Sequence, residues 1–145
     1  MADVNKPFFL YTDASNYALG AVLCQGSPEA PVPVEYASRL LLPAERNYNT
    51  TDREALAIVW ALEKFRGYLE CNQVFVMTDH QALKWLMNLK SPHERSARWA
   101  LQIQGYGAVI QYIPGHFNVV ADLLSRPPFS DEMLIEMAVC EVSFD

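Results

Sequence analysis

The sequence predicts an α/β domain with a five-stranded mixed sheet, its first three strands antiparallel, flanked by helices. Three short apolar runs joined by turn residues come first, and a long run with helical spacing follows them. Short strands and helices then alternate along the rest of the chain. The chain has 145 residues, of which 51% are hydrophobic, and this is enough for one domain with its own core.

The N-terminal part predicts an antiparallel meander of three strands. Segment 8–13 is aromatic and β-branched, segment 18–24 is apolar, and segment 34–38 alternates between apolar and polar residues. The first two strands are close enough to pair as a hairpin. We expect segment 25–33, which holds three prolines and a glycine, to be a loop.

Helical spacing begins after Thr50. Thr51 and Glu54 fit a capping box, in which both side chains bond backbone N–H groups at the start of a helix. The apolar residues that follow at helical spacing are Ala55, Ile58, Leu62, Phe65 and Leu69. The sequence therefore predicts one long helix that ends at Leu69.

The remaining predicted elements are a strand at 74–79, helices at 81–89 and 92–104, a strand at 109–113, and a helix from Asn118 to Pro127. A helix between the third and fourth strands predicts a right-handed crossover, so that the fourth strand is parallel to another strand. We expect residues 1–126 to form the domain and residues 127–145 to form an acidic linker or tail.

Composition argues against a membrane protein and against a secreted precursor. No apolar run approaches the length of a membrane span, and the N-terminus has no basic region followed by an apolar stretch. Cys24, Cys71 and Cys140 are odd in number and widely spaced, which fits a reducing compartment better than a zinc site or a disulfide framework. We therefore expect an intracellular protein without a membrane partner.

The net charge of −6 is unlike that of a typical nucleic-acid-binding protein, which is basic. Five of the seventeen acids lie in residues 127–145, a segment without Lys or Arg. Residues 1–126 therefore carry twelve acids against eleven bases, a net charge of −1.

Two predicted strands end in Thr-Asp, at Asp13 and Asp79. Ligands of α/β sheets bind outside the carboxyl ends of parallel strands, so these carboxylates converge if the two strands are adjacent and parallel. Close carboxylates repel unless one is protonated or a divalent cation neutralises both, and Mg²⁺ suits oxygen ligands. The alternative is that each Asp caps the turn or helix that follows it.

Glu54 and Asp122 are two further candidate acids. Glu54 lies one turn before Ile58, on the face of its helix that should meet the sheet, although the capping box also explains it. Asp122 lies one turn after Asn118, so both side chains can point the same way, although a solvent-facing acid would also fit there.

Four motifs occur in chain order: LYTDAS at 10–15, NYNTTDREALAIVWAL at 47–62, TDHQAL at 78–83 and GHFNVVADLLSR at 115–126. Together they resemble the ribonuclease H domain of gypsy-type long-terminal-repeat retrotransposon polyproteins, over roughly residues 8–126. The resemblance implies a ribonuclease H-like fold. It also implies that the catalytic and metal-binding acids are Asp13, Glu54, Asp79 and Asp122.

By this resemblance, the reaction is hydrolysis of the RNA strand of an RNA–DNA hybrid with two Mg²⁺ ions, for which Mn²⁺ can substitute. The implied partner is the reverse transcriptase domain of the same polyprotein. An enzyme that selects RNA needs contacts to 2′-hydroxyl groups. The residues that are candidates for substrate binding are Ser15, Asn16, Gln81, His116 and Asn118.

Segment 87–92 has no room for the basic helix with which some relatives bind hybrid, so we expect the isolated domain to bind hybrid weakly.

Other polar residues have two interpretations each. His80 follows a metal acid and either tunes it or packs as a cap. The candidate phosphate contacts are Lys84, Lys90, Arg95, Arg98, Arg39, Arg46 and Arg53, while Trp85 and Trp99 fit the core.

Three hypotheses follow. The first is an active hybrid-specific ribonuclease, which is one domain of a retrotransposon polyprotein. The second is a catalytically weak or inactive domesticated module with a structural or nucleic-acid-binding role. The third is another nuclease of the same fold, and the spacing of the acids counts against it.

If the four acids bind metal, the other charged residues of 1–126 have a net charge of +3. This charge suits a domain that approaches phosphates once metal is bound.

Overall fold

The computed structural model describes residue 3, residues 5–78 and residues 94–113. Its elements in chain order are β1 (Phe8–Ala14), β2 (Ala18–Ser27), β3 (Ala30–Leu40), a 3-10 helix (Glu45–Asn47), α1 (Thr50–Lys64), α2 (Arg66–Leu69), β4 (Val74–Thr78), α4 (Glu94–Gly105) and β5 (Val109–Tyr112). The predicted helix at 81–89, the predicted helix after Asn118 and the boundary at residue 126 lie outside the described residues.

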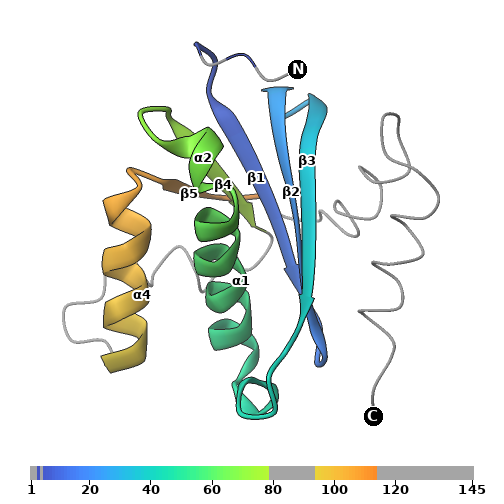
Figure 1. Ribbon diagram of the computed structural model, residues 1–145, viewed down its shortest axis with the longest axis vertical. Coiled ribbons are helices and arrows are strands. Elements are labelled where there is room, and N and C mark those ends of the chain that lie inside the picture. Colours follow the sequence, from blue (N-terminus) through green and yellow to red (C-terminus); the bar gives the residue numbers. More distant parts are fainter. Residues whose placement is uncertain (1–2, 4, 79–93, 114–145) are drawn as a thin grey trace.

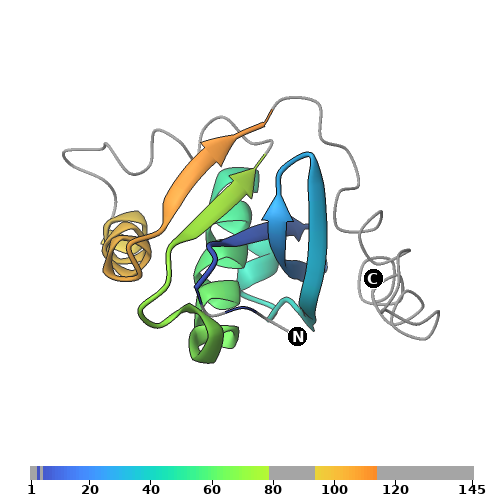
Figure 2. The same cartoon turned by 90° about the horizontal axis from the view of Figure 1, so that it is seen from above.

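The five strands form one mixed sheet in the order β3-β2-β1-β4-β5 (Figure 1). The β1–β2 and β2–β3 pairs are antiparallel, whereas β4 is parallel to both β1 and β5. This confirms the predicted meander and the crossover that makes the fourth strand parallel. Figure 2 shows α1 and α4 on the same side of the sheet.

The prediction of a loop over residues 25–33 was wrong. β2 runs to Ser27 and β3 starts at Ala30, so a tight hairpin joins two long strands. Pro31 and Pro33 lie inside β3, and the sheet tolerates them because β3 is an edge strand. Gly26 has a φ of 90°, and a Cβ there would come within 2.7 Å of the Ala30 carbonyl oxygen.

The predicted capping box at the start of α1 was also wrong. The N-cap is Asn49, whose side chain accepts a hydrogen bond from the Asp52 backbone N–H at 2.8 Å. Thr51 and Glu54 therefore both lie inside the helix, and Glu54 is too far along it to complete a capping box. The rest of the predicted helix forms, with an interruption at Phe65 between α1 and α2.

The two faces of the sheet bury separate apolar clusters, because successive strand residues point to opposite faces. On the first face, Phe8 and Leu10 of β1 pack with α1, α2 and α4 residues such as Ile58, Leu69 and Ile103. The cluster on the second face consists of Phe9, Tyr11, Val22, Cys24 and Met77. Both clusters hold β1 at the centre of the sheet.

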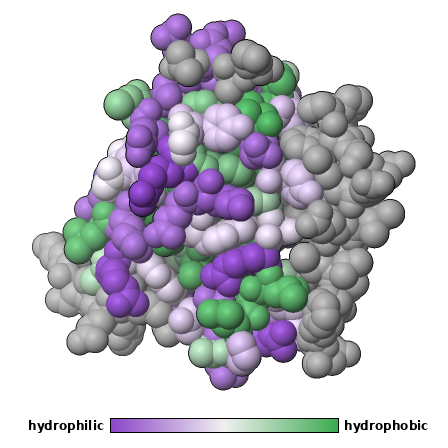
Figure 3. Space-filling model, in the orientation of Figure 1, coloured by the Kyte–Doolittle hydropathy of each residue, from purple (hydrophilic) through white to green (hydrophobic). Residues whose placement is uncertain are grey.

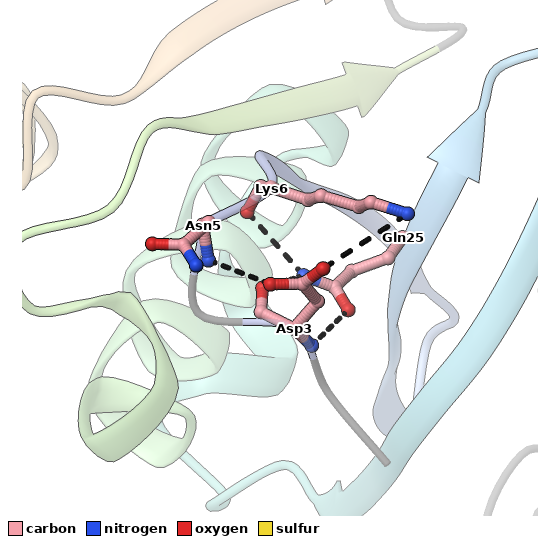
Figure 4. A network of polar contacts seen from close by, with 4 residues as sticks. All are labelled: Asp3, Asn5, Lys6 and Gln25. Carbon is pink, nitrogen blue, oxygen red and sulfur yellow. Dashed lines mark hydrogen bonds and ion pairs between the residues drawn. The ribbon is translucent and has the colours of Figure 1, made fainter.

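The N-terminal segment is tied to β2 by the buried side chain of Gln25 (Figure 4). Its amide oxygen accepts a hydrogen bond from the Asp3 N–H at 2.8 Å. Its amide nitrogen donates to the carbonyl oxygens of Asp3 at 2.6 Å and Lys6 at 3.3 Å. This contact fixes the path of the chain into the first strand, at the opposite end of β1 from Asp13.

The surface over the helices is mainly polar, with small separate apolar patches (Figure 3). The large apolar side chains that are exposed among the described residues are spread over β3, the segment after it, α4 and β5: Val32, Leu40, Leu42, Leu101 and Val109. Such scattered residues are normal on a protein surface. Within the described ranges, no helix is long and apolar enough to cross a membrane.

Candidate functional site

The carboxyl ends of β1 and β4 lie side by side, which is the condition for the predicted site. The parallel register pairs Leu10 with Val76 and Tyr11 with Met77. Asp13 therefore stands two residues beyond Tyr11, the last residue of β1 that pairs with β4, and in the sequence Asp79 stands two residues beyond Met77. Asp79 itself lies outside the described residues.

Asp13 is exposed near the end of β1. Its Oδ1 atom accepts a hydrogen bond from the backbone N–H of Ala14 at 3.0 Å. The residue opposite Asp13 on β2 is Gly20, which brings no side chain to the same face beside the carboxylate. Burial raises the pKa of Tyr11, two residues earlier on that face, to about 12, so its phenol stays neutral at physiological pH.

Glu54 lies near the start of α1, with its side chain half-buried. One and two turns further along the same face are Ile58, Ala61 and Leu62, which are all fully buried against the sheet. Figure 1 shows that α1 begins at the end of the molecule where β1 ends. The fold therefore brings Asp13 and Glu54 to the same end of the sheet, and a capping box no longer accounts for Glu54.

The segment that leads into α1 is held by an ion pair between Arg39 and Glu45. The two guanidinium nitrogens of Arg39 donate to the two carboxylate oxygens of Glu45 at 2.8 and 3.1 Å, and the Leu42 N–H donates to the same carboxylate at 2.8 Å. The hydrogen bonds from Arg39 lower the pKa of Glu45 below its usual value. The pair fixes the connection from β3 to the helix that carries Glu54.

The turn after Asp13 holds two of the predicted substrate contacts. The Ser15 hydroxyl accepts hydrogen bonds from the N–H groups of Tyr17 and Ala18 at 3.1 and 3.0 Å, so this side chain shapes the β1–β2 turn. Asn16 is exposed in that turn. The predicted site residues that lie outside the described residues are Asp79, His80, Gln81, His116, Asn118 and Asp122.

The predicted cationic residues before α1 and in its first turn make contacts within the chain. Arg39 pairs with Glu45, and Arg53 donates to the Tyr48 carbonyl oxygen at 2.5 Å. The Arg46 guanidinium lies over the Tyr17 ring, 5.7 Å from its centre. These contacts stabilise the same end of the sheet, so a role in phosphate binding is not needed to explain these residues.

The described part of α4 supports the core interpretation of its tryptophan. Trp99 is buried and packs against Tyr48, with 6.0 Å between the ring centres. Arg98 beside it is exposed. Trp85, Lys84 and Lys90 lie outside the described residues, as does the side chain of Arg95.

The described half of the site offers the chemistry that a hard divalent cation requires. Asp13 and Glu54 supply carboxylate oxygens, the ligand type that Mg²⁺ prefers. Next to Asp13, the hydroxyl oxygen of Thr12 is buried without a hydrogen-bond partner among the described residues. These groups fit such a cation, although residues 3, 5–78 and 94–113 contain no cluster of three or more metal ligands.

Sequence reasoning missed Thr12 and the Arg39–Glu45 pair. A signal for Thr12 was present, since the same residue precedes both Asp13 and Asp79. No sequence periodicity joins Arg39 to Glu45, because the connection between them is irregular.

Comparison with known sequences places the chain in a family. Residues 3–106 match the family described as an RNase H-like domain found in reverse transcriptase. The Retrovirus-related Pol polyprotein from transposon 297 of Drosophila melanogaster is 47% identical over 126 residues, and that from transposon gypsy of the same organism is 42% identical over 125 residues. These matches cover 87% and 86% of this chain but only 12% of each polyprotein.

Solved structures share the fold at low sequence identity. The RNase H1 of Halobacterium salinarum NRC-1 has a TM-score of 0.61 and 15% identity, and the match covers 90% of this chain and 98% of that one. The foamy viral protease-reverse transcriptase in complex with RNA/DNA hybrid has a TM-score of 0.64 and 16% identity, over 90% of this chain and 18% of that one. Both likenesses concern the fold.

Proposed function

Because the chain belongs to the family of RNase H-like domains found in reverse transcriptase, we propose that it hydrolyses the RNA strand of RNA–DNA hybrids as one domain of a retrotransposon polyprotein. The observation that carries the proposal is that β1 and α1 bring Asp13 and Glu54 to the same end of the sheet, where the parallel β1–β4 pair ends. A protein of similar fold is known in complex with RNA/DNA hybrid, which supports the choice of substrate.

We assign the catalytic role to four acids: Asp13, Glu54, Asp79 and Asp122. Together they would hold two Mg²⁺ ions, or Mn²⁺ in their place. Such ions activate a water molecule and stabilise the charge that develops on the leaving 3′ oxygen. The fold contributes position: β1 fixes Asp13 from the centre of the sheet, and the buried face of α1 fixes Glu54.

Binding and selection of the hybrid fall to residues around these acids. We assign contacts with the minor groove to Asn16, which is exposed in the β1–β2 turn, and to Ser15, Gln81, His116 and Asn118. Contacts to 2′-hydroxyl groups there would select RNA over DNA. The relatives are long polyproteins, so we propose that the reverse transcriptase part of the same polypeptide makes further contacts that bind the hybrid.

The test is a cleavage assay on the full 145-residue chain. End-labelled RNA–DNA hybrid, double-stranded RNA and double-stranded DNA are incubated with Mg²⁺ or Mn²⁺, beside an Asp79→Asn variant. We expect cleavage of the RNA in the hybrid alone, and none by the variant. If the RNA in the hybrid stays intact at high protein concentration, or if the variant cleaves it equally well, the proposal is wrong.

A further inference from the structure

The hydroxyl of Thr12 is buried at the site end of the sheet, and none of the described residues is its hydrogen-bond partner. Its oxygen has no hydrogen bond to any of the described residues, and it is one of only two such buried side-chain atoms in that part of the chain. A buried polar group without a partner destabilises the fold, whereas valine has the same shape without that penalty. The position is therefore suboptimal for stability alone.

The direction of the Thr12 side chain follows from the alternation along β1. Phe8 and Leu10 belong to the cluster on the face covered by α1, and Phe9 and Tyr11 belong to the cluster on the other face. Thr12 continues the first series, so its side chain lies on the α1 face of the sheet. It is the last residue of β1 before Asp13 and the only polar residue of this series.

Glu54 belongs to the helix that covers the same face of the sheet. It extends the buried stripe of α1 formed by Ile58 and Ala61, and α1 starts at the end of the molecule where β1 ends (Figure 1). Thr12 and Glu54 are thus polar residues that β1 and α1 contribute to the same end of the molecule.

We propose that Thr12 is a positioning residue, whose hydroxyl donates a hydrogen bond to the Glu54 carboxylate when a divalent cation occupies the site. One carboxylate oxygen then faces the cation and the other accepts from Thr12, since carboxylates that bind metal are held by a further hydrogen bond. The inference rests on the proposed function, because it takes Glu54 to be a metal ligand. It explains why a hydroxyl remains where an apolar group would pack better.

The experiment compares four full-length proteins: the wild type, Thr12→Val, Thr12→Ser and the matched control Thr50→Val. Thr50 also lies near Glu54, but it is exposed at the start of α1. For each protein, the Tm is measured without metal and with Mn²⁺, and cleavage of hybrid is measured over a range of Mg²⁺ concentrations.

Without metal, we expect Thr12→Val to raise the Tm by about 2–6 °C, because it removes the unpaired hydroxyl. With Mn²⁺, its gain in Tm should be smaller than that of the wild type, and its cleavage rate should be roughly 10-fold lower. Thr12→Ser should restore both the gain in Tm and the cleavage rate. Thr50→Val loses only a long, exposed hydrogen bond from Arg53, and should match the wild type in its gain in Tm with Mn²⁺ and in its cleavage rate.

A lower Tm of Thr12→Val without metal would overturn the inference, since the hydroxyl would then already be bonded in the unloaded protein. A gain in Tm with Mn²⁺ equal to that of the wild type would also overturn it. Failure of the proposed function gives a different result: the wild type then cleaves no hybrid, and the Tm measurements with and without Mn²⁺ still decide the role of Thr12.

Discussion

Glu45→Gln is the substitution that tests most directly how the start of α1 is held. The carboxylate of Glu45 accepts hydrogen bonds from both terminal guanidinium nitrogens of Arg39 (Nη1 and Nη2), at 2.8 and 3.1 Å, and from the Leu42 N–H at 2.8 Å. The variant keeps one oxygen, which can still accept from Leu42. It turns an NH₂ group toward Arg39, so one hydrogen bond and the opposite charge are lost.

The expected loss of stability lies between two reference values. Hydrogen bonds to charged groups contribute about 1.5–3 kcal/mol, whereas exposed ion pairs contribute about 0–1 kcal/mol. The side chain of Glu45 is 11% exposed and that of Arg39 is 30% exposed, which makes this pair partly buried. We therefore expect Glu45→Gln to lower the free energy of unfolding by about 2 kcal/mol at pH 7.

The effect depends on pH in a defined direction. Arg39 lowers the pKa of Glu45 in the folded protein, so the carboxylate stabilises the fold fully above its unfolded value of 4.5. This stabilisation is lost as the pH falls through the folded-state pKa. The difference between wild type and variant should therefore be constant from pH 7 to about pH 5 and shrink at lower pH.

Urea unfolding at several pH values measures this difference, and Glu70→Gln is the matched control because Glu70 is exposed. The control should differ from the wild type by less than about 0.5 kcal/mol. A loss below about 0.5 kcal/mol for Glu45→Gln at pH 7, or a loss that stays the same down to pH 3, would refute the reasoning.

Three further substitutions test other parts of the fold by urea unfolding. Gln25→Glu loses the donors to the carbonyls of Asp3 and Lys6 and should lower the free energy of unfolding by about 1–3 kcal/mol; an unchanged value would show that the N-terminal segment is not held there. Asn49→Ala removes the α1 N-cap and should lower the free energy of unfolding by about 0.5–2 kcal/mol, which is more than Thr51→Ala should lower it. A larger loss for Thr51→Ala would instead support the capping box of Thr51 and Glu54. Ile58→Ala, at a fully buried position, should cost about 2–5 kcal/mol, and a loss below 1 kcal/mol would contradict the packing of α1 on the sheet.

Much of the fold could be predicted because apolar periodicity survives in the sequence. The aromatic and β-branched residues of 8–13 and the short run in 74–79 predicted β1 and β4, and helical spacing predicted α1. The loop over 25–33 was a wrong prediction because prolines were taken as breaks in a strand. The position of β3 at the edge of the sheet, which allows them, depends on strand order and is not visible in local sequence.

The start of α1 shows a second limit of sequence reasoning. Asn49 and Thr51 are both good N-cap residues, and each is followed three residues later by an acid. The local sequence does not decide between them, and in the folded chain Asn49 is the N-cap. That decision matters for the site, because it removes the capping explanation for Glu54.

The part of the candidate site that lies at the strand ends could be predicted from the sequence. Two Thr-Asp endings placed Asp13 at the carboxyl end of a strand, and the parallel β1–β4 pair confirms the arrangement that this required. The roles of Arg39, Glu45 and Thr12 arise from contacts between segments that share no pattern. They emerge only from the folded chain.

The most direct test of the central claim is a double-mutant cycle on the cleavage of RNA–DNA hybrid, with Asp13→Asn, Glu54→Gln and the double variant. Glu63→Gln, at an exposed acid near the other end of α1, serves as the control. If the two acids act as one site, each single variant should lose about 100-fold or more in rate, and the double variant should lose little beyond that. Losses that multiply, or a single variant that cleaves as fast as Glu63→Gln, would contradict a shared site.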